Sequence, residues 1–542
     1  MADEQERVVS ETHNAKFDEK HDEETHQDNG EVTEYPSKAK LTIITIALCL
    51  AVFLMALDNA IIATAIPRIT EQFHSLTDVG WYGSAYLLTT AALQLQFGKF
   101  YTYLSIKWVF LAAVGIFELG SLLCGVAQSS TMLIVGRAIA GLGAAGIYSG
   151  ALIILATSVP LEKRPAYIGL IGSMYGVSSV AGPLLGGAFT DKATWRWCFY
   201  INLPLGAITV GLIMFFFPQP QQQKPPPEPL LKRIDRFDPI GTLFLVPAVI
   251  CLLLVLQWGG IKYPWSNGRI IALFIISALL LLGFVGVQLW KRDNATVPPR
   301  VFRNRTVWAS SLYAFGLGAS FFIGVYYIPI WFQAVKGNSA VGSGIRNLPM
   351  MLSAVLLSIL AGILVTAQGH YAPYLYIGTV LMSIGAGFLS TWEPDTKSSV
   401  WIGYQILFGV GVGVCLQQPM VAVQTVLDMK DVPVGASLIV FVQSLGGAMF
   451  VSVGETVLTN QLVKELAKNA PNVRPTDVIA AGSSRLQSTF HGDALRGIIL
   501  SYNEALSEVF IVGTAMAAFT IIGCVCVEWK SVKGKKVELA MA

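Results

Sequence analysis

Four ionisable residues lie inside apolar stretches of this 542-residue chain, where a charge is unfavourable: Asp58, Glu118, Arg137 and, nearer the end of its stretch, Glu455. On insertion scales, a charge at the centre of a membrane helix costs about 2.5–3.5 kcal/mol, so each needs a partner or a water-filled cavity. No histidine falls inside such a stretch. If this chain moves protons, carboxylates whose pKa is raised by burial must carry them.

Asp58, Glu118 and Arg137 fall at depths that allow them to share one layer, given a rise of about 1.5 Å per residue. We expect Asp58 to pair with Arg137 and to carry protons. Other interpretations remain open for each residue. The pair could only join two helices, Glu118 could be a hydrogen-bonded structural carboxyl, and Glu455 could extend to the surface.

The composition places these residues in a membrane. The chain is 54% hydrophobic and 13% charged, whereas a soluble protein carries about 25% charged residues. Apolar runs near 20 residues can each cross a hydrocarbon core of about 30 Å. The sequence predicts an all-α membrane protein with fourteen transmembrane helices, at 42–66, 80–98, 108–127, 132–156, 166–190, 198–217, 239–258, 269–290, 307–333, 346–366, 371–391, 400–420, 434–458 and 507–528.

The loops on one side of these spans carry about twice as many Lys and Arg residues as the short loops opposite. By the positive-inside rule, both termini are therefore cytoplasmic. Residues 1–41 form an acidic tail that we expect to be disordered, and 529–542 form a basic tail. The segment 459–506 then becomes a long external loop, which the charge rule does not constrain.

The sequence contains no signature of an enzyme or of a cofactor site. There is no phosphate-binding loop, nucleophile elbow or metal-ligand spacing. The seven cysteines fall in apolar segments or at their ends, so we expect neither disulfides nor a metal. We therefore expect no cofactor, no enzymatic activity and no nucleic-acid partner.

A weak internal repeat divides the chain into two halves. Leu185-Gly186-Gly187-Ala188 in the fifth span recurs as Leu445-Gly446-Gly447-Ala448 in the thirteenth, and the glycine-rich fourth span has a counterpart in the twelfth. Two six-helix halves of this kind are a recurring design of secondary transporters. The predicted parts are a six-helix bundle at 42–217, a Pro/Gln-rich basic linker at 218–238, two inserted helices at 239–290, a basic loop at 291–306 and a second six-helix bundle at 307–528.

Several motifs in order along the chain resemble those of the major facilitator superfamily, and among them those of fourteen-span drug:proton antiporters such as fungal toxin and multidrug efflux pumps. Leu57 to Pro67 resembles the aspartate motif of the first span, and Gly136 to Gly143 resembles the arginine motif of the fourth. Gly182-Pro183-Leu184-Leu185-Gly186-Gly187 resembles the fifth-span motif associated with antiporters. Gly98 to Lys107 resembles the loop motif between spans 2 and 3, although Tyr101 stands where many members have an aspartate.

The resemblance implies a major facilitator fold and assigns candidate roles. Asp58, Arg137, Glu118 and Glu455 are the candidates for proton coupling. Small and basic residues of the motifs are candidates for helix packing and conformational change: Gly98, Lys99, Lys107, Gly176, Gly182, Pro183, Gly186 and Gly187. Polar and aromatic residues at midplane depth are candidates for contact with substrate: Tyr86, Gln94, Tyr326, Tyr327, Phe441 and Gln443.

The leading functional hypothesis is proton-driven export of a small-molecule substrate across a lipid bilayer by alternating access. We expect a monomer in the plasma membrane, with the vacuolar membrane as the alternative. A second hypothesis is a proton-linked transporter of siderophores or basic amino acids. A third hypothesis is a non-transporting membrane sensor of nutrients. A sensor would have a large folded cytoplasmic tail, which we expect of neither the acidic N-terminal tail nor the short basic C-terminal tail.

Overall fold

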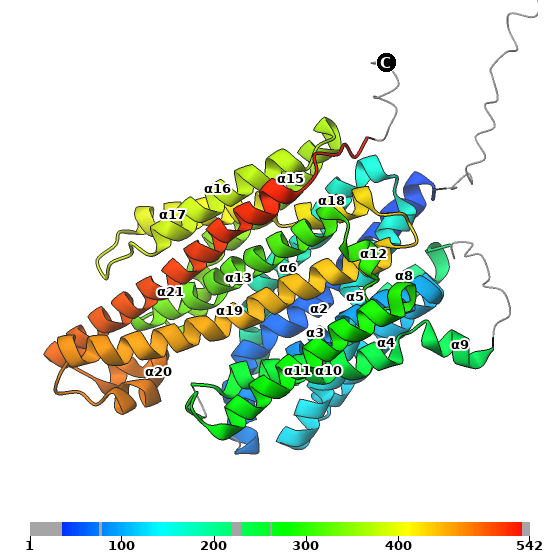
Figure 1. Ribbon diagram of the computed structural model, residues 1–542. Helices are drawn as coiled ribbons and strands as arrows, with labels where there is room; N and C mark the ends of the chain where they lie inside the picture. Colours follow the sequence, from blue (N-terminus) through cyan, green and yellow to red (C-terminus); the bar gives the residue numbers. More distant parts are fainter. Residues whose placement is uncertain (1–34, 75–77, 219–228, 261–262, 534–542) are drawn as a thin grey trace, which may run out of the picture. The chain divides into compact units, whose positions relative to one another are not determined.

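The computed structural model describes residues 35–74, 78–218, 229–260 and 263–533, and within these ranges it is a bundle of long helices (Figure 1). The predicted disorder of residues 1–34 lies outside the described residues, as do residues 219–228 of the linker and residues 534–542 of the basic tail. The helices are α2 (Lys38–Phe73), α3 (Val79–Tyr103), α4 (Ile106–Gly125), α5 (Ser130–Ser158), η3 (Leu161–Lys163), α6 (Arg164–Lys192), α7 (Trp197–Tyr200), α8 (Asn202–Phe216), α9 (Leu230–Asp235), α10 (Pro239–Trp258), α11 (Gly268–Lys291), η4 (Arg292–Asn294), α12 (Pro299–Phe302), α13 (Arg305–Ala334), α14 (Ala340–Arg346), α15 (Leu348–Gln368), α16 (Ala372–Leu389), α17 (Ser398–Cys415), α18 (Gln418–Val426), α19 (Val432–Asn469), α20 (Pro475–Thr489) and α21 (Gly492–Cys526).

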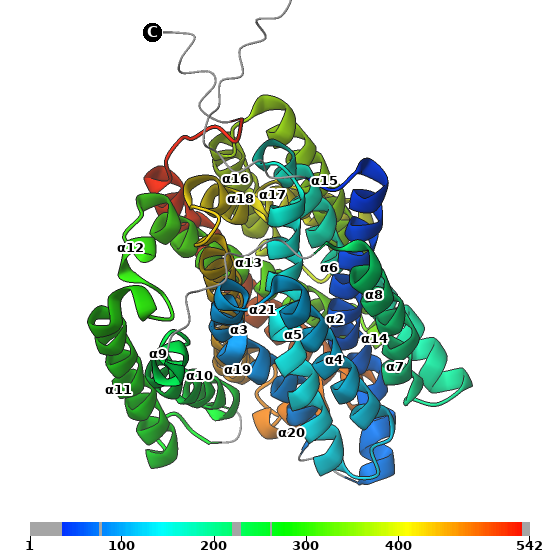
Figure 2. The same ribbon diagram turned by 90° about the vertical axis from the view of Figure 1, so that its right-hand side faces the viewer.

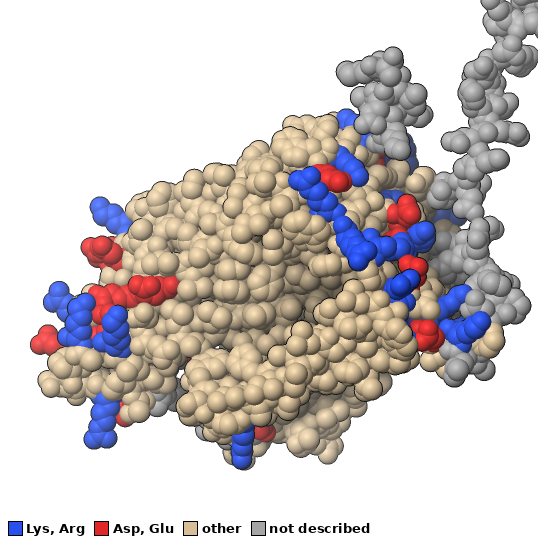
Figure 3. Space-filling model, in the orientation of Figure 1, with Lys and Arg blue, Asp and Glu red and all other residues tan. Residues whose placement is uncertain are grey.

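The surface follows the pattern of a membrane protein. Among the described residues, 13 helical segments are long and apolar enough to cross a bilayer. Helix α3 is less apolar, but its 25 residues are also long enough to span. On the face shown in Figure 3, charged side chains gather at the two ends of the helices and leave an uncharged band between them. One end carries α9 and α12, and the other carries α20 (Figure 1); we call them the α9/α12 end and the α20 end.

The long helices form two halves. In the first half, α2 packs on α6, and α5 packs on α3 and α4. In the second, α13 packs on α19 and α21, while α17 packs on α15 and α16. The halves meet where α6 lies along α15 and where α19 lies along α3 and α5.

Of the repeated glycines, Gly186 and Gly446 occupy equivalent packing positions in the two halves. A Cβ on Gly186 of α6 would lie 2.8 Å from Ile61 O of α2, and a Cβ on Gly446 of α19 would lie 3.0 Å from Phe315 C of α13. In both halves the fifth helix therefore approaches the backbone of the first. Small residues allow such close approach between membrane helices.

The two inserted helices, α10 and α11, pack against each other beside the halves (Figure 2). Helix α10 also contacts α3 and α19, so it touches both halves. Asp238 begins α10 in the left-handed region (φ 50°) and caps it by accepting a hydrogen bond from Gly241 N at 2.9 Å. The same carboxylate accepts from Gln288 of α11 and from Thr296, which fixes the end of the inserted pair.

Three sequence-based boundaries differ from the structure. Residues 459–506 are not one external loop: α19 continues to Asn469, α20 follows, and α21 begins at Gly492. The predicted spans end where polar residues begin, because hydropathy detects only the apolar part of a helix. In the structure the helices continue through those polar residues. The predicted span 400–420 is divided into α17 and α18 just before Pro419, and 198–217 into α7 and α8 before Pro204.

Candidate functional site

Asp58 and Arg137 form an ion pair inside the first half. Arg137 Nη1 contacts Asp58 Oδ2, and neither side chain is exposed. Asn202 of α8 donates its amide to Asp58 Oδ1 at 3.1 Å and to Ser121 Oγ of α4 at 3.1 Å. The expected pair is therefore present. Because Asp58 lies on α2, Arg137 on α5 and Asn202 on α8, this polar cluster joins three helices directly and α4 through Ser121.

The guanidinium of Arg137 is fixed by further contacts. Its Nε donates to Tyr82 O at 2.8 Å, and its central carbon lies 4.5 Å from the centre of the Tyr86 ring. The Tyr86 hydroxyl donates to Met55 O at 3.1 Å. Tyr86 thus supports Arg137 by a cation–π contact. Nη2 of Arg137 is buried without a partner among the described residues.

Glu118 lies next to this cluster. It precedes Ser121 by three residues on α4, so the two side chains lie on the same helix face. Both of its carboxylate oxygens are buried without a hydrogen-bond partner among the described residues. A Cβ on Gly206 of α8 would collide with the carboxyl group, so this glycine provides the space that Glu118 occupies.

Glu455 is placed in the other half, away from Asp58. It lies on α19, close enough to Tyr327 of α13 and Tyr502 of α21 to interact electrostatically with both. Its side chain is partly exposed.

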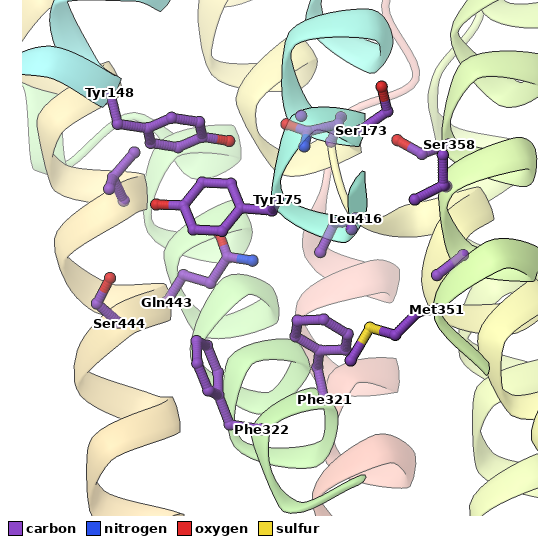
Figure 4. Close-up of a pocket in the computed structure, with 16 residues that line it drawn as sticks. Tyr148, Ser173, Tyr175, Phe321, Phe322, Met351, Ser358, Leu416, Gln443 and Ser444 are labelled. Atoms are coloured by element: carbon purple, nitrogen blue, oxygen red, sulfur yellow. The ribbon is translucent and has the colours of Figure 1, made fainter. Parts of the chain in front are cut away.

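A cavity lies between the two halves near the middle of the helices (Figure 4). It holds about 690 Å³ of empty space, part of it open to solvent. The first half supplies Tyr148 of α5 and Tyr175 of α6, whose rings meet edge to face at 5.3 Å. The second half contributes aromatic, sulfur and amide side chains from α13, α15, α19 and the break between α17 and α18: Phe321, Phe322, Met351, Gln417 and Gln443.

A further exposed tyrosine lies beyond the cavity wall, toward the α20 end. Tyr326 follows Phe322 by four residues and so lies one helical turn further along the same face of α13. Its side chain is 43% exposed, and that of Tyr175 is 37% exposed.

Toward the α9/α12 end the halves are in close contact. A Cβ on Gly98 of α3 would lie 2.8 Å from Ser437 Oγ of α19, and a Cβ on Gly169 of α6 would lie 2.6 Å from Ser358 O of α15. Ala166 N donates to Thr366 Oγ1 across the same contact at 3.2 Å. The structure therefore closes the cavity at this end.

A polar brace reinforces the closed end. Lys99 of α3 donates to Asn294 O at 3.1 Å, which ties the first half to the connection after α11. Arg300 of the same connection binds Asp431 at the start of α19 through two hydrogen bonds, at 2.5 and 2.7 Å. The hydrogen bonds to Asp431 raise the pKa of Arg300 above its ordinary value. The connection thus links α3 to α19.

The other motif residues pack within or between the halves. Lys107 donates to Met214 O and Phe217 O at the end of α8, inside the first half. Helix α6 runs unbroken through Pro183. A Cβ on Gly182 would lie 2.7 Å from Ala60 Cβ of α2, whereas nothing lies within 4 Å of one on Gly187. Gly176 lines the cavity beside Val355.

The structure brings one of the six substrate candidates, Gln443, into the wall of the cavity. Tyr326 lies outside that wall, one helical turn beyond Phe322. Tyr86 supports Arg137, Tyr327 donates to Val451 O at 2.6 Å, and Phe441 is buried. Gln94 is buried, with its amide nitrogen unpartnered among the described residues.

Sequence reasoning missed the two tyrosines and Gln417. Tyr148 and Tyr175 sit among the glycines of the fourth and fifth spans, where the glycine spacing marked close packing but not which residues face the other half. Gln417 lies where the twelfth span breaks, and the Gln417-Gln418-Pro419 sequence was the available signal for that break.

Comparison with known proteins identifies the family. Residues 48–451 match the sequence profile of the Major Facilitator Superfamily. The chain belongs to this superfamily. It is 56% identical over 512 residues to the MFS-type efflux pump MFS1 of Arthroderma benhamiae, covering 94% of this chain and 96% of that protein. It is also 51% identical to the efflux pump roqT of Penicillium rubens, covering 93% and 94% of the two chains.

Solved structures of the superfamily share the fold. The proton:xylose symporter XylE matches with a TM-score of 0.56 at 13% identity, covering 88% of this chain and 95% of that chain. The human organic anion transporter MFSD10 matches with a TM-score of 0.55 at 13% identity, covering 88% and 99%. Membership of the superfamily makes this chain a multi-pass membrane transporter and not an enzyme. The predicted family, fold class and transporter class are thus confirmed.

Proposed function

We propose that this chain exports small organic compounds by antiport with protons. The names of its relatives support the direction of transport, since two proteins at least 51% identical over more than nine tenths of this chain are called efflux pumps. The relative called the aspyridones efflux protein, from Neocamarosporium betae, is 48% identical over 94% of this chain and supports a secondary metabolite or toxin as the substrate class.

The cavity between the halves is the observation that carries this proposal. Both halves bound it, and the Gly98 and Gly169 contacts close it at one end. In this proposal the exit lies at the other end, past the exposed Tyr326. In alternating access, two bundles rock about a central site so that one end closes as the other opens. A compound released past Tyr326 would leave on the side of the α20 end.

The proton carrier in this proposal is Asp58. Protonation removes the negative charge that faces Arg137 and so weakens the joint between α2 and α5, while Asn202 remains bonded to the carboxyl group. The driving force is about 2.3 kcal/mol per proton for each 100 mV of potential and about 1.4 kcal/mol for each pH unit. Glu118 is the second candidate because its carboxyl group lies next to the cluster and has no hydrogen-bond partner in the described part of the chain.

The positive-inside rule supports an orientation with the α9/α12 end in the cytoplasm. We infer that the protein acts as a monomer in the plasma membrane and that the proton gradient is its energy source, without a bound cofactor. The alternative is the vacuolar membrane. Fluorescence microscopy of the tagged full-length chain distinguishes the two locations.

Two measurements test the direction and the coupling. Expression in a drug-sensitive host should permit growth on toxic aromatic compounds, while an importer of siderophores or amino acids would increase sensitivity. In inverted vesicles with an imposed pH gradient, the same compounds should accumulate, and an uncoupler should abolish this accumulation. Accumulation that persists after the uncoupler contradicts antiport, and a complete lack of transport across the panel favours the sensor hypothesis.

A further inference from the structure

The cavity wall has a chemical character more specific than that of a general drug-binding surface. Among the described residues that line it, none is charged. The intramembrane carboxylates are placed elsewhere: Asp58 is bound by Arg137 and Asn202, and neither Glu118 nor Glu455 is part of the wall.

Aromatic rings supply most of the flat surface of the cavity. Tyr148 and Tyr175 meet edge to face at 5.3 Å, and Phe321 and Phe322 meet edge to face at 5.5 Å on the other half. Figure 4 shows these rings around the same space, with Met351 beside Phe321. Rings from both halves favour an aromatic ligand, because aromatic pairs stabilise each other beyond the effect of the area that they bury.

The polar groups in the wall are amides and hydroxyls. Gln417 lies at the break between α17 and α18 and pairs with the Tyr148 hydroxyl, and Gln443 lies on α19 near Tyr175 (Figure 4). Ser358 Oγ is buried without a partner among the described residues. Amides and hydroxyls both donate and accept hydrogen bonds, so they match a ligand that carries both kinds of group.

A cationic ligand would fit this wall poorly. Transfer of an ion into an apolar site without a charge partner is strongly unfavourable, whereas a neutral polar group needs only hydrogen bonds. No lining carboxylate is available as a counter-ion among the described residues.

We propose that the transported compound is uncharged when bound and is an aromatic molecule with both hydrogen-bond donors and acceptors. This inference rests on the proposed function, since it treats the cavity as the transport site. Tyr148 and Tyr175 hold the ring system from the first half, and Gln417 and Gln443 bond its polar groups from the second.

Two probes test the ligand class as a whole, because the cationic one also lacks the hydrogen-bonding groups of the neutral one. Acridone is a neutral tricycle with one N–H donor and one carbonyl acceptor, and N-methylacridinium is a permanently cationic tricycle of similar size. Binding to the full chain in nanodiscs is measured by the polarisation of the probe's own fluorescence, with empty nanodiscs to subtract lipid partition. Acridone should bind at least about tenfold more tightly than the cation, a difference of about 1.4 kcal/mol. Equal or tighter binding of the cation, or no saturable binding of acridone, overturns the inference.

Two variants locate the effect in the cavity. Tyr175→Ala should weaken acridone binding by about tenfold. Gln443→Glu should increase binding of the cation as the pH rises and the new carboxyl ionises. Gln72→Glu is the matched control, because Gln72 is exposed outside the cavity and its side-chain oxygen accepts from Trp195, which a carboxylate can still do. If Gln443→Glu folds but leaves the preference of the chain unchanged, the charge inference is wrong.

Transport of the same probes separates this inference from the proposed function. Acridone that binds as expected but does not accumulate under a pH gradient contradicts proton-driven export and leaves the ligand class standing. Gradient-driven transport of the cation, with weak acridone binding, supports export and overturns the ligand class.

Discussion

Arg137 Nη1 is bound to Asp58 Oδ2 in a place where neither side chain reaches solvent. Two buried charges of opposite sign stabilise each other only when both are present, because removal of one leaves the other unpaired in an apolar environment. Here α2 and α5 are joined by this pair, and Asn202 adds α8 to the joint. A proton that neutralises Asp58 therefore changes the packing of three helices.

Single and double replacement of the pair should give unequal losses of stability. Asp58→Leu and Arg137→Met should each lower the free energy of unfolding by about 3–5 kcal/mol, because each leaves a buried charge unpaired. The double variant should lose much less. Thermal unfolding in detergent measures all three, and a double variant as unstable as the sum of the single ones would contradict a compensating pair.

Glu118→Gln should reduce coupling to the pH gradient while the fold is preserved. Glutamine has nearly the same shape and fits the space beside Gly206, but it cannot carry a proton. If Glu118 carries one coupled proton, the accumulation ratio should fall by up to about tenfold for each pH unit of gradient. Glu71→Gln, at an exposed ion pair with Arg68, is the control. An unchanged ratio in Glu118→Gln would leave this residue a structural carboxyl.

A methyl group on Gly98 should favour the state that is open at the α9/α12 end. Its Cβ would lie 2.8 Å from Ser437 Oγ and 3.2 Å from Pro433 O, so closure would force α3 away from α19. Gly187→Ala should have no such effect, since nothing lies within 4 Å of that position. Labelling of Ser173→Cys, in the cavity wall, by an impermeant maleimide added at the α9/α12 end reports the difference. Equal labelling in both glycine variants would contradict the proposed gate.

Charge exchange between Arg300 and Asp431 tests the brace. Arg300→Asp or Asp431→Arg alone places like charges together and should increase labelling of the same cysteine from the α9/α12 end. The two changes together should restore protection. Because Arg300 is 47% exposed at its side chain, the effect should be modest, about 1 kcal/mol or less in the equilibrium between states. If the double exchange behaves like the single ones, the pair does not hold this end closed.

The ion pair could be predicted from the sequence, whereas most residues of the cavity wall could not. A charge inside a span demands compensation, and Asp58 and Arg137 were the residues of opposite sign at similar depth. The wall of the cavity gives no comparable signal, because a tyrosine such as Tyr175 is equally compatible with packing and with substrate contact. Which face of a glycine-rich helix meets the other half depends on long-range packing that periodicity does not reveal.

The ends of the helices could be predicted from the sequence only in part. Hydropathy measures the part of a helix in the membrane, so the polar extensions of α19 and α21 were taken as loop. The break before Pro419 brings Gln417 into the cavity, but in the sequence it looked like one continuous apolar span.

Transport by Asp58→Asn, compared with the unaltered chain in inverted vesicles, tests proton-coupled export through Asp58 most directly. The variant should still exchange labelled compound across the membrane at equal concentrations, because the cavity is intact. It should fail to accumulate the compound when a pH gradient is imposed, whereas the unaltered chain accumulates it. Gradient-driven accumulation in Asp58→Asn equal to that of the unaltered chain would contradict the assignment of Asp58 as the proton carrier.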